Sequence, residues 1–124
     1  DGGDTLLERV DGAGVGIAVV SSNTEANIRI GLGPVNAARV DIFDCGASVF
    51  GKLKKLKRVA RRFGVAPGEV LSVGDDSRDV DAGRQAGFST AAVGWGYASE
   101  PALAGASPTF IVRSMAELSS VIGV

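Results

Sequence analysis

The sequence predicts an α/β fold in which a parallel sheet carries helices on both faces. Apolar runs of strand length alternate along the chain with segments of helix length, and this alternation is typical of parallel sheets. The connections between these segments are short, as one compact domain requires. A length of 124 residues suits one domain with a modest core. We therefore expect a single three-layer, Rossmann-like domain over residues 1–124.

Each expected strand is a short, mostly apolar run. The runs at 15–20 (VGIAVV) and 70–73 (VLSV) are apolar enough to lie at the centre of a sheet. The run at 40–45 is interrupted by aspartates and suits an edge strand. The five expected strands cover residues 15–20, 40–45, 70–73, 90–93 and 109–112.

Helix starts and ends are marked by capping residues. Ser22 with Glu25, and Ser114 with Glu117, have the spacing of a capping box, and Gly87 is placed to end a helix. The clearest helical pattern lies at 52–63, where the apolar residues fall on one face. The expected helices cover residues 6–10, 22–31, 52–63, 77–86 and 115–122, with a short one starting near 99–101.

Composition excludes several classes of chemistry. The chain has no histidine and one cysteine, Cys45, which rules out Ser–His–Asp and Cys–His catalysis, His-ligated zinc and an internal disulfide. The net charge of −1 argues against a protein built as a whole for nucleic acid. No apolar run approaches the ~20 residues that span a bilayer, and the acidic start does not resemble a signal peptide. We expect a cytoplasmic protein that binds neither nucleic acid nor membrane.

Carboxylates gather where the expected strand at 70–73 gives way to a helix. Asp75, Asp76 and Asp79 lie there, and Asp81 adds a fourth. Such carboxylates repel one another unless a cation or a proton lies among them, and hard oxygen ligands suit Mg²⁺. The alternative is that they favour the positive end of a helix dipole.

Two other strand ends carry groups that suit an anion. Ser21, Ser22 and Asn23 follow the first strand and would place hydroxyls, an amide and free N–H groups at a helix start; ordinary N-capping is the alternative. Lys52 lies just inside the next helix, where a surface lysine is the alternative. Because the carboxyl ends of parallel strands meet at one edge, serine, lysine and carboxylates together predict a phosphate-plus-Mg²⁺ site.

The helix at 52–63 holds seven of the thirteen basic residues. We interpret them as a solvated helix face. Nucleic-acid binding is the minor alternative, because no aromatic residues are interleaved with them. The seven are Lys52, Lys54, Lys55, Lys57, Arg58, Arg61 and Arg62.

These motifs, in this order, resemble those of the haloacid dehalogenase-like (HAD) hydrolases, and in particular the phosphoglycolate phosphatase-like branch. The similar segments are GVGIAVVSSN, FGKLKKL, GDDSRDVDAGRQAG and AVGWGY, and the resemblance covers about residues 6–122. The strand that ends at Ser21 resembles the family's second motif, Lys52 its third, and Gly74-Asp75 with Asp79 its fourth. The resemblance implies a HAD-like core, Mg²⁺ as cofactor and a small phosphorylated substrate.

By this resemblance, Ser21 would hydrogen-bond the transferring phosphoryl group, assisted by N–H groups around Ser22 and Asn23. Lys52 would neutralise the charge of the phosphate and the nucleophile. These roles agree with the physics of phosphoryl transfer, in which positioning and charge stabilisation supply most of the catalysis.

The resemblance also implies metal ligands. Asp75 would ligate Mg²⁺. Asp76 and Asp79 would ligate it directly, through water, or by orienting other ligands.

The family's first motif, DxDGT after an apolar strand, is not found in the chain. Residues 1–6 read DGGDTL, which has similar letters in another order. The helical cap domain is not found either, so the chain resembles the C-terminal part of the core domain. We expect a phosphatase that acts through an aspartyl-phosphate in the intact protein, and no turnover by this chain alone.

A receiver-like signalling module, or another phosphate- and metal-binding module, is the alternative function. Receivers are also small α/β domains with an acidic Mg²⁺ site, and Asp75 would be their phosphoacceptor. Against it, Ser21 and Ser22 follow the first strand where receivers place acidic residues. The sequence WGY at 95–97 stands where they place a lysine.

In the family, the first-motif strand lies between the strands that end at Ser21 and Gly74. Without it, both strands have an unpaired edge, which favours self-association. Direct pairing of 15–20 with 70–73 would satisfy the backbone groups and give the strand order 2-1-3-4-5, which we favour for a complete chain. A second chain or an N-terminal peptide in the gap is the alternative.

Overall fold

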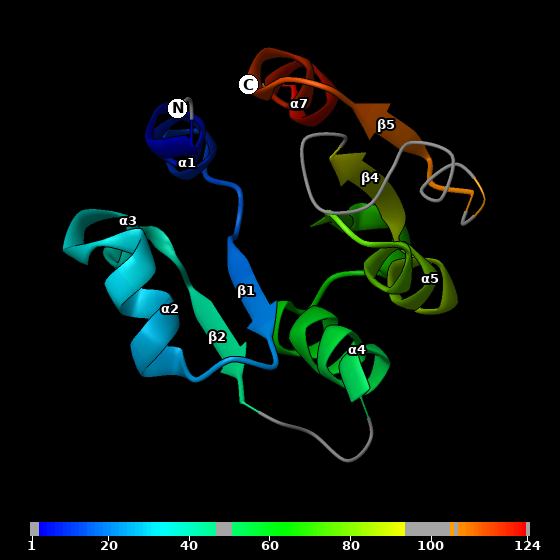
Figure 1. The fold of residues 1–124 in the computed structure, drawn as a ribbon, viewed down its shortest axis with the longest axis horizontal. Coiled ribbons are helices and arrows are strands. Elements are labelled where there is room, and N and C mark those ends of the chain that lie inside the picture. Colours follow the sequence, from blue (N-terminus) through cyan, green and yellow to red (C-terminus); the bar gives the residue numbers. More distant parts are fainter. Residues whose placement is uncertain (1–2, 47–50, 94–104, 106, 124) are drawn as a thin grey trace.

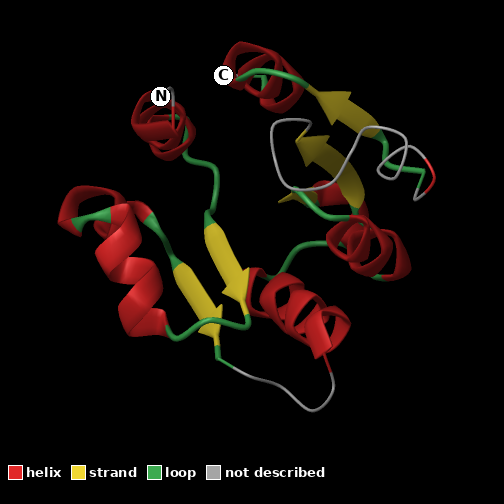
Figure 2. Cartoon of the chain, in the orientation of Figure 1, coloured by secondary structure: helices red, strands yellow, loops and turns green. Residues whose placement is uncertain are grey.

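The computed structural model describes residues 3–46, 51–93, 105 and 107–123. Over these residues, strands and helices alternate as predicted (Figure 1; Figure 2). The expected short helix near 99–101 and the WGY segment at 95–97 lie outside the described residues. The strands are β1 Ala18–Ser21, β2 Ile42–Cys45, β3 Leu71–Gly74, β4 Ser89–Val93 and β5 Phe110–Val112.

Helices connect these strands and confirm most of the predicted segments. One short helix was not predicted: α3, which begins at Pro34. Gly33-Pro34 ends one helix and starts the next, because proline is well tolerated at the first helical position. The helices are α1 Gly3–Gly12, α2 Glu25–Leu32, α3 Pro34–Arg39, α4 Gly51–Phe63, η1 Pro67–Glu69, α5 Ser77–Gln85 and α7 Met115–Ile122.

One of the two predicted capping boxes is wrong. Helix α2 is capped by Thr24, whose side chain accepts the Asn27 N–H, and not by Ser22. The helix starts late because the residues before it form a turn at the end of β1. In the other predicted capping box, the role of the serine is confirmed, since the Ser114 hydroxyl accepts the Glu117 N–H at 3.1 Å.

All the strand pairs of the described chain are parallel, as predicted. They form two separate sheets, β1-β2 and β3-β4-β5. The favoured pairing of 15–20 with 70–73 is therefore wrong: the described residues contain no ladder between β1 and β3. The two sheets are joined through side chains instead. Leu56 and Ala60 of α4 pack with Ala82 of α5, and two residues lie against this cluster: Val20 of β1, and Val70 directly before β3.

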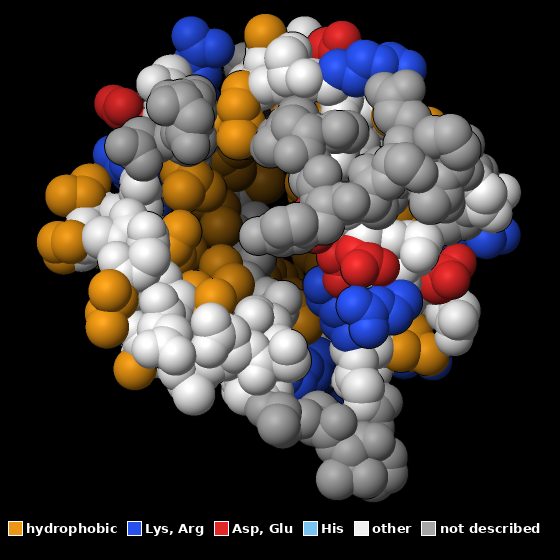
Figure 3. Space-filling model, in the orientation of Figure 1, with side chains coloured by type: hydrophobic (Ala, Val, Ile, Leu, Met, Phe, Trp, Pro, Cys, Tyr) orange, Lys and Arg blue, Asp and Glu red, His pale blue; other side chains and the backbone are white. Residues whose placement is uncertain are grey.

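The free edges of β1 and β3 border a hollow. Figure 3 shows hydrophobic side chains around this hollow between the two sheets. Val15, just before β1, is 46% exposed, and Val73 in β3 is 45% exposed. Both are apolar residues of segments that were expected to lie in the centre of one sheet.

The helices cover both faces of the β3-β4-β5 sheet, as predicted. On one face, α5 packs Val80 against Ala92 of β4. On the other, Leu118 of α7 packs with Ala91 and Val112, and Leu6 of α1 lies against this cluster. Among the described residues, no helix is both long and apolar enough to cross a membrane.

Candidate active site

The end of β1 forms a tight polar turn. The Ser21 hydroxyl accepts the Asn23 N–H at 3.1 Å, and the Asn23 side chain accepts the Thr24 N–H at 2.9 Å. The N–H of Gly46, directly after β2, donates to the carbonyls of Ser21 and Asn23. Gly46 has a φ of +105°, a conformation that suits glycine. The turn is thus held by the end of the neighbouring strand, and it presents the Ser21 hydroxyl beside the start of α2.

A lysine that the sequence analysis placed on a solvated face also holds this turn. Lys55 of α4 is buried, and its ammonium donates to the Ser21 carbonyl at 2.9 Å and to the Gly46 carbonyl. The interpretation of all seven basic residues as solvated is therefore wrong for Lys55. Arg58 is also engaged, since its guanidinium makes two hydrogen bonds of 2.7 Å to Asp44 of β2.

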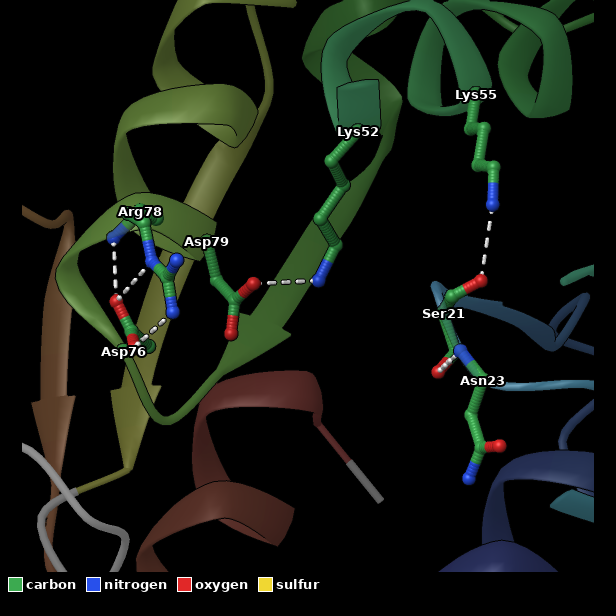
Figure 4. Close-up of polar contacts among 7 residues, drawn as sticks. All are labelled: Ser21, Asn23, Lys52, Lys55, Asp76, Arg78 and Asp79. Atoms are coloured by element: carbon green, nitrogen blue, oxygen red, sulfur yellow. Dashed lines mark hydrogen bonds and ion pairs between the residues drawn. The ribbon is translucent and has the colours of Figure 1, made fainter. Parts of the chain in front are cut away.

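Lys52 joins α4 to the predicted carboxylate cluster. Its ammonium lies 2.6 Å from Asp79 Oδ1 in the first turn of α5, and both side chains are partly buried. Figure 4 shows the two lysines of α4 reaching in different directions, Lys52 to Asp79 and Lys55 to Ser21. The first turns of α4 therefore contact both halves of the predicted site: the carboxylate half at the end of β3, with Asp79, and the hydroxyl half at the end of β1, with Ser21.

The Asp76 carboxylate hydrogen-bonds a neighbouring residue of its own helix. As the N-cap of α5, it accepts the Arg78 N–H at 2.8 Å, and it forms an ion pair with the Arg78 guanidinium at 3.2 Å. These hydrogen bonds hold the pKa of the Asp76 carboxyl below its ordinary value. The helix-capping alternative thus describes Asp76 well.

The three predicted metal ligands do not converge in this structure. Within the described residues, no group of three or more Asp, Glu, Cys or His side chains is placed to hold a metal ion. Asp75 follows β3 and is half-buried, and its side chain makes no hydrogen bond or ion pair with the described residues. Asp79 uses one oxygen for Lys52, and its Oδ2 lies over Gly74. Asp75 and Asp79 carry hard oxygen donors of the kind that Mg²⁺ prefers, whereas the Asp76 carboxylate is engaged by Arg78.

The structure thus brings some predicted residues together and not others. It joins Lys52 with Asp79, and it places Ser21 and Asn23 in one turn, while Ser22 is exposed beside them. Sequence reasoning missed Lys55. A usable signal was present, because Lys55 lies next to Leu56 and four residues before Val59, on the margin of the apolar face of α4.

Comparison with known proteins agrees with the motifs. A family model described as "Haloacid dehalogenase-like hydrolase" matches residues 1–93. A phosphoglycolate phosphatase of Synechococcus elongatus is 28% identical over 118 residues, which are 94% of this chain and 56% of that protein. A tyrosine-protein kinase, PtkA, of Mycobacterium tuberculosis is 31% identical over 130 residues, covering 100% of this chain and 45% of that protein.

Solved structures show the same fold. The crystal structure of a predicted phosphatase from Clostridium acetobutylicum matches with a TM-score of 0.87 at 19% identity, covering 100% of this chain and 60% of that one. The chain spans about half the length of these two curated relatives.

Proposed function

Because the chain belongs to the haloacid dehalogenase-like hydrolase family, we propose that it supplies phosphate-binding and metal-binding residues to a phosphatase of small phosphomonoesters. The observation that carries this proposal is the contact between Lys52 and Asp79. These two residues lie 27 positions apart and meet at 2.6 Å at the carboxyl end of β3, where ligands bind in α/β sheets.

The chain's own residues would bind and orient the phosphoryl group. The Ser21 hydroxyl and the N–H groups at the start of α2 would donate hydrogen bonds to its oxygens. The Lys52 ammonium would balance their negative charge, with Asp79 holding the lysine in place. Mg²⁺ bound by Asp75 and Asp79 would supply further charge neutralisation at the phosphoryl oxygens.

The reaction of the whole protein is part of the same proposal. We expect an aspartyl-phosphate intermediate in the intact enzyme, with a nucleophile carboxylate that the motifs of this chain do not provide. The chain alone should therefore bind a phosphomonoester without turning it over. Steady Mg²⁺-dependent release of p-nitrophenol from p-nitrophenyl phosphate by the pure chain would contradict that expectation.

Binding of phosphoglycolate tests the proposed site directly. In the presence of Mg²⁺, we expect the chain to broaden the ³¹P resonance of phosphoglycolate, and Lys52→Met to reduce the effect by about tenfold or more, because a hydrogen-bonded charge is lost. Lys57→Met is the matched control, since Lys57 is exposed on the same helix. Equal broadening by the wild-type chain and Lys52→Met would contradict the proposal.

The receiver-like alternative is favoured by one observation: the Asp75 carboxylate at the end of β3 has no hydrogen-bond or ion-pair partner among the described residues. Acetyl phosphate distinguishes the two functions. A receiver would acquire a stable phosphoryl group on Asp75, detected as an added phosphate in the intact mass and lost in Asp75→Asn. A phosphatase fragment would not be modified.

A further inference from the structure

Lys55 is buried in a way that lysines seldom are. Its residue surface is only 6% exposed, although it lies in the most basic helix of the chain. A buried ammonium is strongly unfavourable unless its charge is balanced and its donors are hydrogen-bonded. The contacts that compensate this burial therefore indicate what the residue does.

Those contacts are backbone carbonyls at the ends of two strands. The Lys55 ammonium donates to the carbonyl of Ser21, the last residue of β1, and to the carbonyl of Gly46, the first residue after β2. The Ser21 carbonyl also accepts the Gly46 N–H at 3.0 Å. One ammonium thus joins both strand ends to α4. Asp44 of β2 supplies nearby negative charge, and its pKa is lowered mainly by its hydrogen bond to Arg58 and further by Lys55.

We propose that Lys55 is a positioning residue that holds the turn of Ser21 and Asn23 in the conformation that binds phosphate. This inference rests on the proposed function. Lys52 and Lys55 are three residues apart, so they lie on neighbouring parts of one helix face. Lys52 reaches the carboxylate half of the site and Lys55 the hydroxyl half (Figure 4). Because β1 and β3 share no ladder in the described chain, α4 fixes the spacing between the two halves.

The same geometry defines how Lys55 acts. Its ammonium is bound to carbonyl oxygens on the strand side, so it orders the turn and adds positive charge beneath it. The ammonium does not bind the Ser21 hydroxyl, which instead accepts the Asn23 N–H within the turn at 3.1 Å. Loss of the ammonium would free the Ser21 carbonyl and the Gly46 carbonyl together, and the turn would lose its attachment to α4.

The test compares inorganic phosphate binding and local order in three variants. In ¹H–¹⁵N spectra of the chain with Mg²⁺, we expect Lys55→Met to weaken phosphate affinity about tenfold or more and to speed hydrogen exchange of the Asn23 N–H. Lys55→Arg, which keeps a charged donor, should restore most of the affinity. Lys57→Met, the exposed control on α4, should change neither quantity. Unchanged affinity and unchanged Asn23 exchange in a folded Lys55→Met chain would overturn the inference.

Two further measurements separate this inference from the proposed function. If the wild-type chain binds no phosphate, the proposed phosphate site fails, and Asn23 exchange alone decides whether Lys55 orders the turn. If Lys55→Met does not fold, the wild-type ammonium is observed directly. Scalar couplings from Lys55 Nζ across hydrogen bonds to the carbonyl carbons of Ser21 and Gly46 would support the inference, and a freely rotating, rapidly exchanging ammonium would overturn it.

Discussion

The Asp79 side chain lies directly against Gly74. A Cβ atom built on Gly74 would lie 2.4 Å from Asp79 Cβ and 2.9 Å from its Oδ2. No larger residue fits there without movement of the α5 backbone, since Cβ is not the mobile end of a side chain. The glycine that ends β3 is therefore what allows the Asp79 carboxylate to lie over the strand end and meet Lys52.

Gly74→Ala should break this arrangement. We expect a loss of about 1–3 kcal/mol in the free energy of unfolding, as for other over-packed positions, together with loss of the ion pair between Lys52 and Asp79. Urea denaturation measures the first effect. Gly68→Ala is the control, because nothing lies within 4 Å of a Cβ at Gly68. Equal stability of the two variants would contradict the steric account.

Mg²⁺ should stabilise the chain through Asp75 and Asp79. With only two protein carboxylates, we expect a dissociation constant on the order of millimolar. At ten times that concentration, binding adds about 1.4 kcal/mol to the free energy of unfolding, which raises the melting temperature by several degrees. Asp75→Asn should remove most of this increase in a thermal melt.

Asp81→Asn is the control for the metal prediction, since Asp81 is an exposed carboxylate on the same helix. It should leave the Mg²⁺ effect in place. If the melting curve of the wild-type chain does not change up to tens of millimolar Mg²⁺, the carboxylates near α5 serve only the helix dipole.

Local patterns were sufficient to predict most of the secondary structure and to place Lys52 and Asp79 at one edge of the sheet. The strands and most helices follow from runs of apolar residues and from capping residues such as Ser114. The spacing of Gly74, Asp75 and Asp79, together with an earlier lysine, marked Lys52 and Asp79 as site residues. The structure brings these two side chains into contact. In these cases the signal lies in side-chain types at fixed spacings.

Other features depend on tertiary structure that side-chain patterns do not encode. The partners of Lys55 are backbone carbonyls, which every residue has, so the sequence contains no sign of them. The separation of β1 from β3 was also missed, because apolar strands favour pairing wherever their edges can meet. Here the cluster of α4 and α5, which includes Leu56 and Ala82, joins the two sheets through side chains.

The free edges of β1 and β3 should make the chain self-associate. Unpaired edges of apolar strands pair readily with other chains, and Val73 of β3 is 45% exposed. We expect sedimentation velocity to show association that increases with concentration, and Val73→Lys to reduce it. Ile30→Lys, at an exposed position on α2, should have little effect. A wild-type chain that stays monomeric at hundreds of micromolar would contradict this prediction.

The ion pair of Asp44 and Arg58 should contribute stability that depends on pH. Its hydrogen bonds to Arg58 hold the pKa of the largely buried Asp44 below the ordinary value of 3.8. A carboxyl with a lowered folded-state pKa stabilises the fold above its unfolded pKa, and this contribution is lost as the pH falls through the folded-state value. At pH 7, we expect Arg58→Met to lower the free energy of unfolding, because the buried Asp44 carboxylate loses its charged partner; the exposure of Arg58 keeps the effect modest.

The difference in stability between wild type and Arg58→Met should therefore shrink as the pH is lowered from about 5 to below the depressed pKa of Asp44. Urea denaturation at a series of pH values measures this difference. Arg61→Met, which removes an exposed arginine from the same helix, controls for the general change in net charge. A difference between wild type and Arg58→Met that stays constant down to the acid transition would show that Asp44 is not the group stabilised by Arg58.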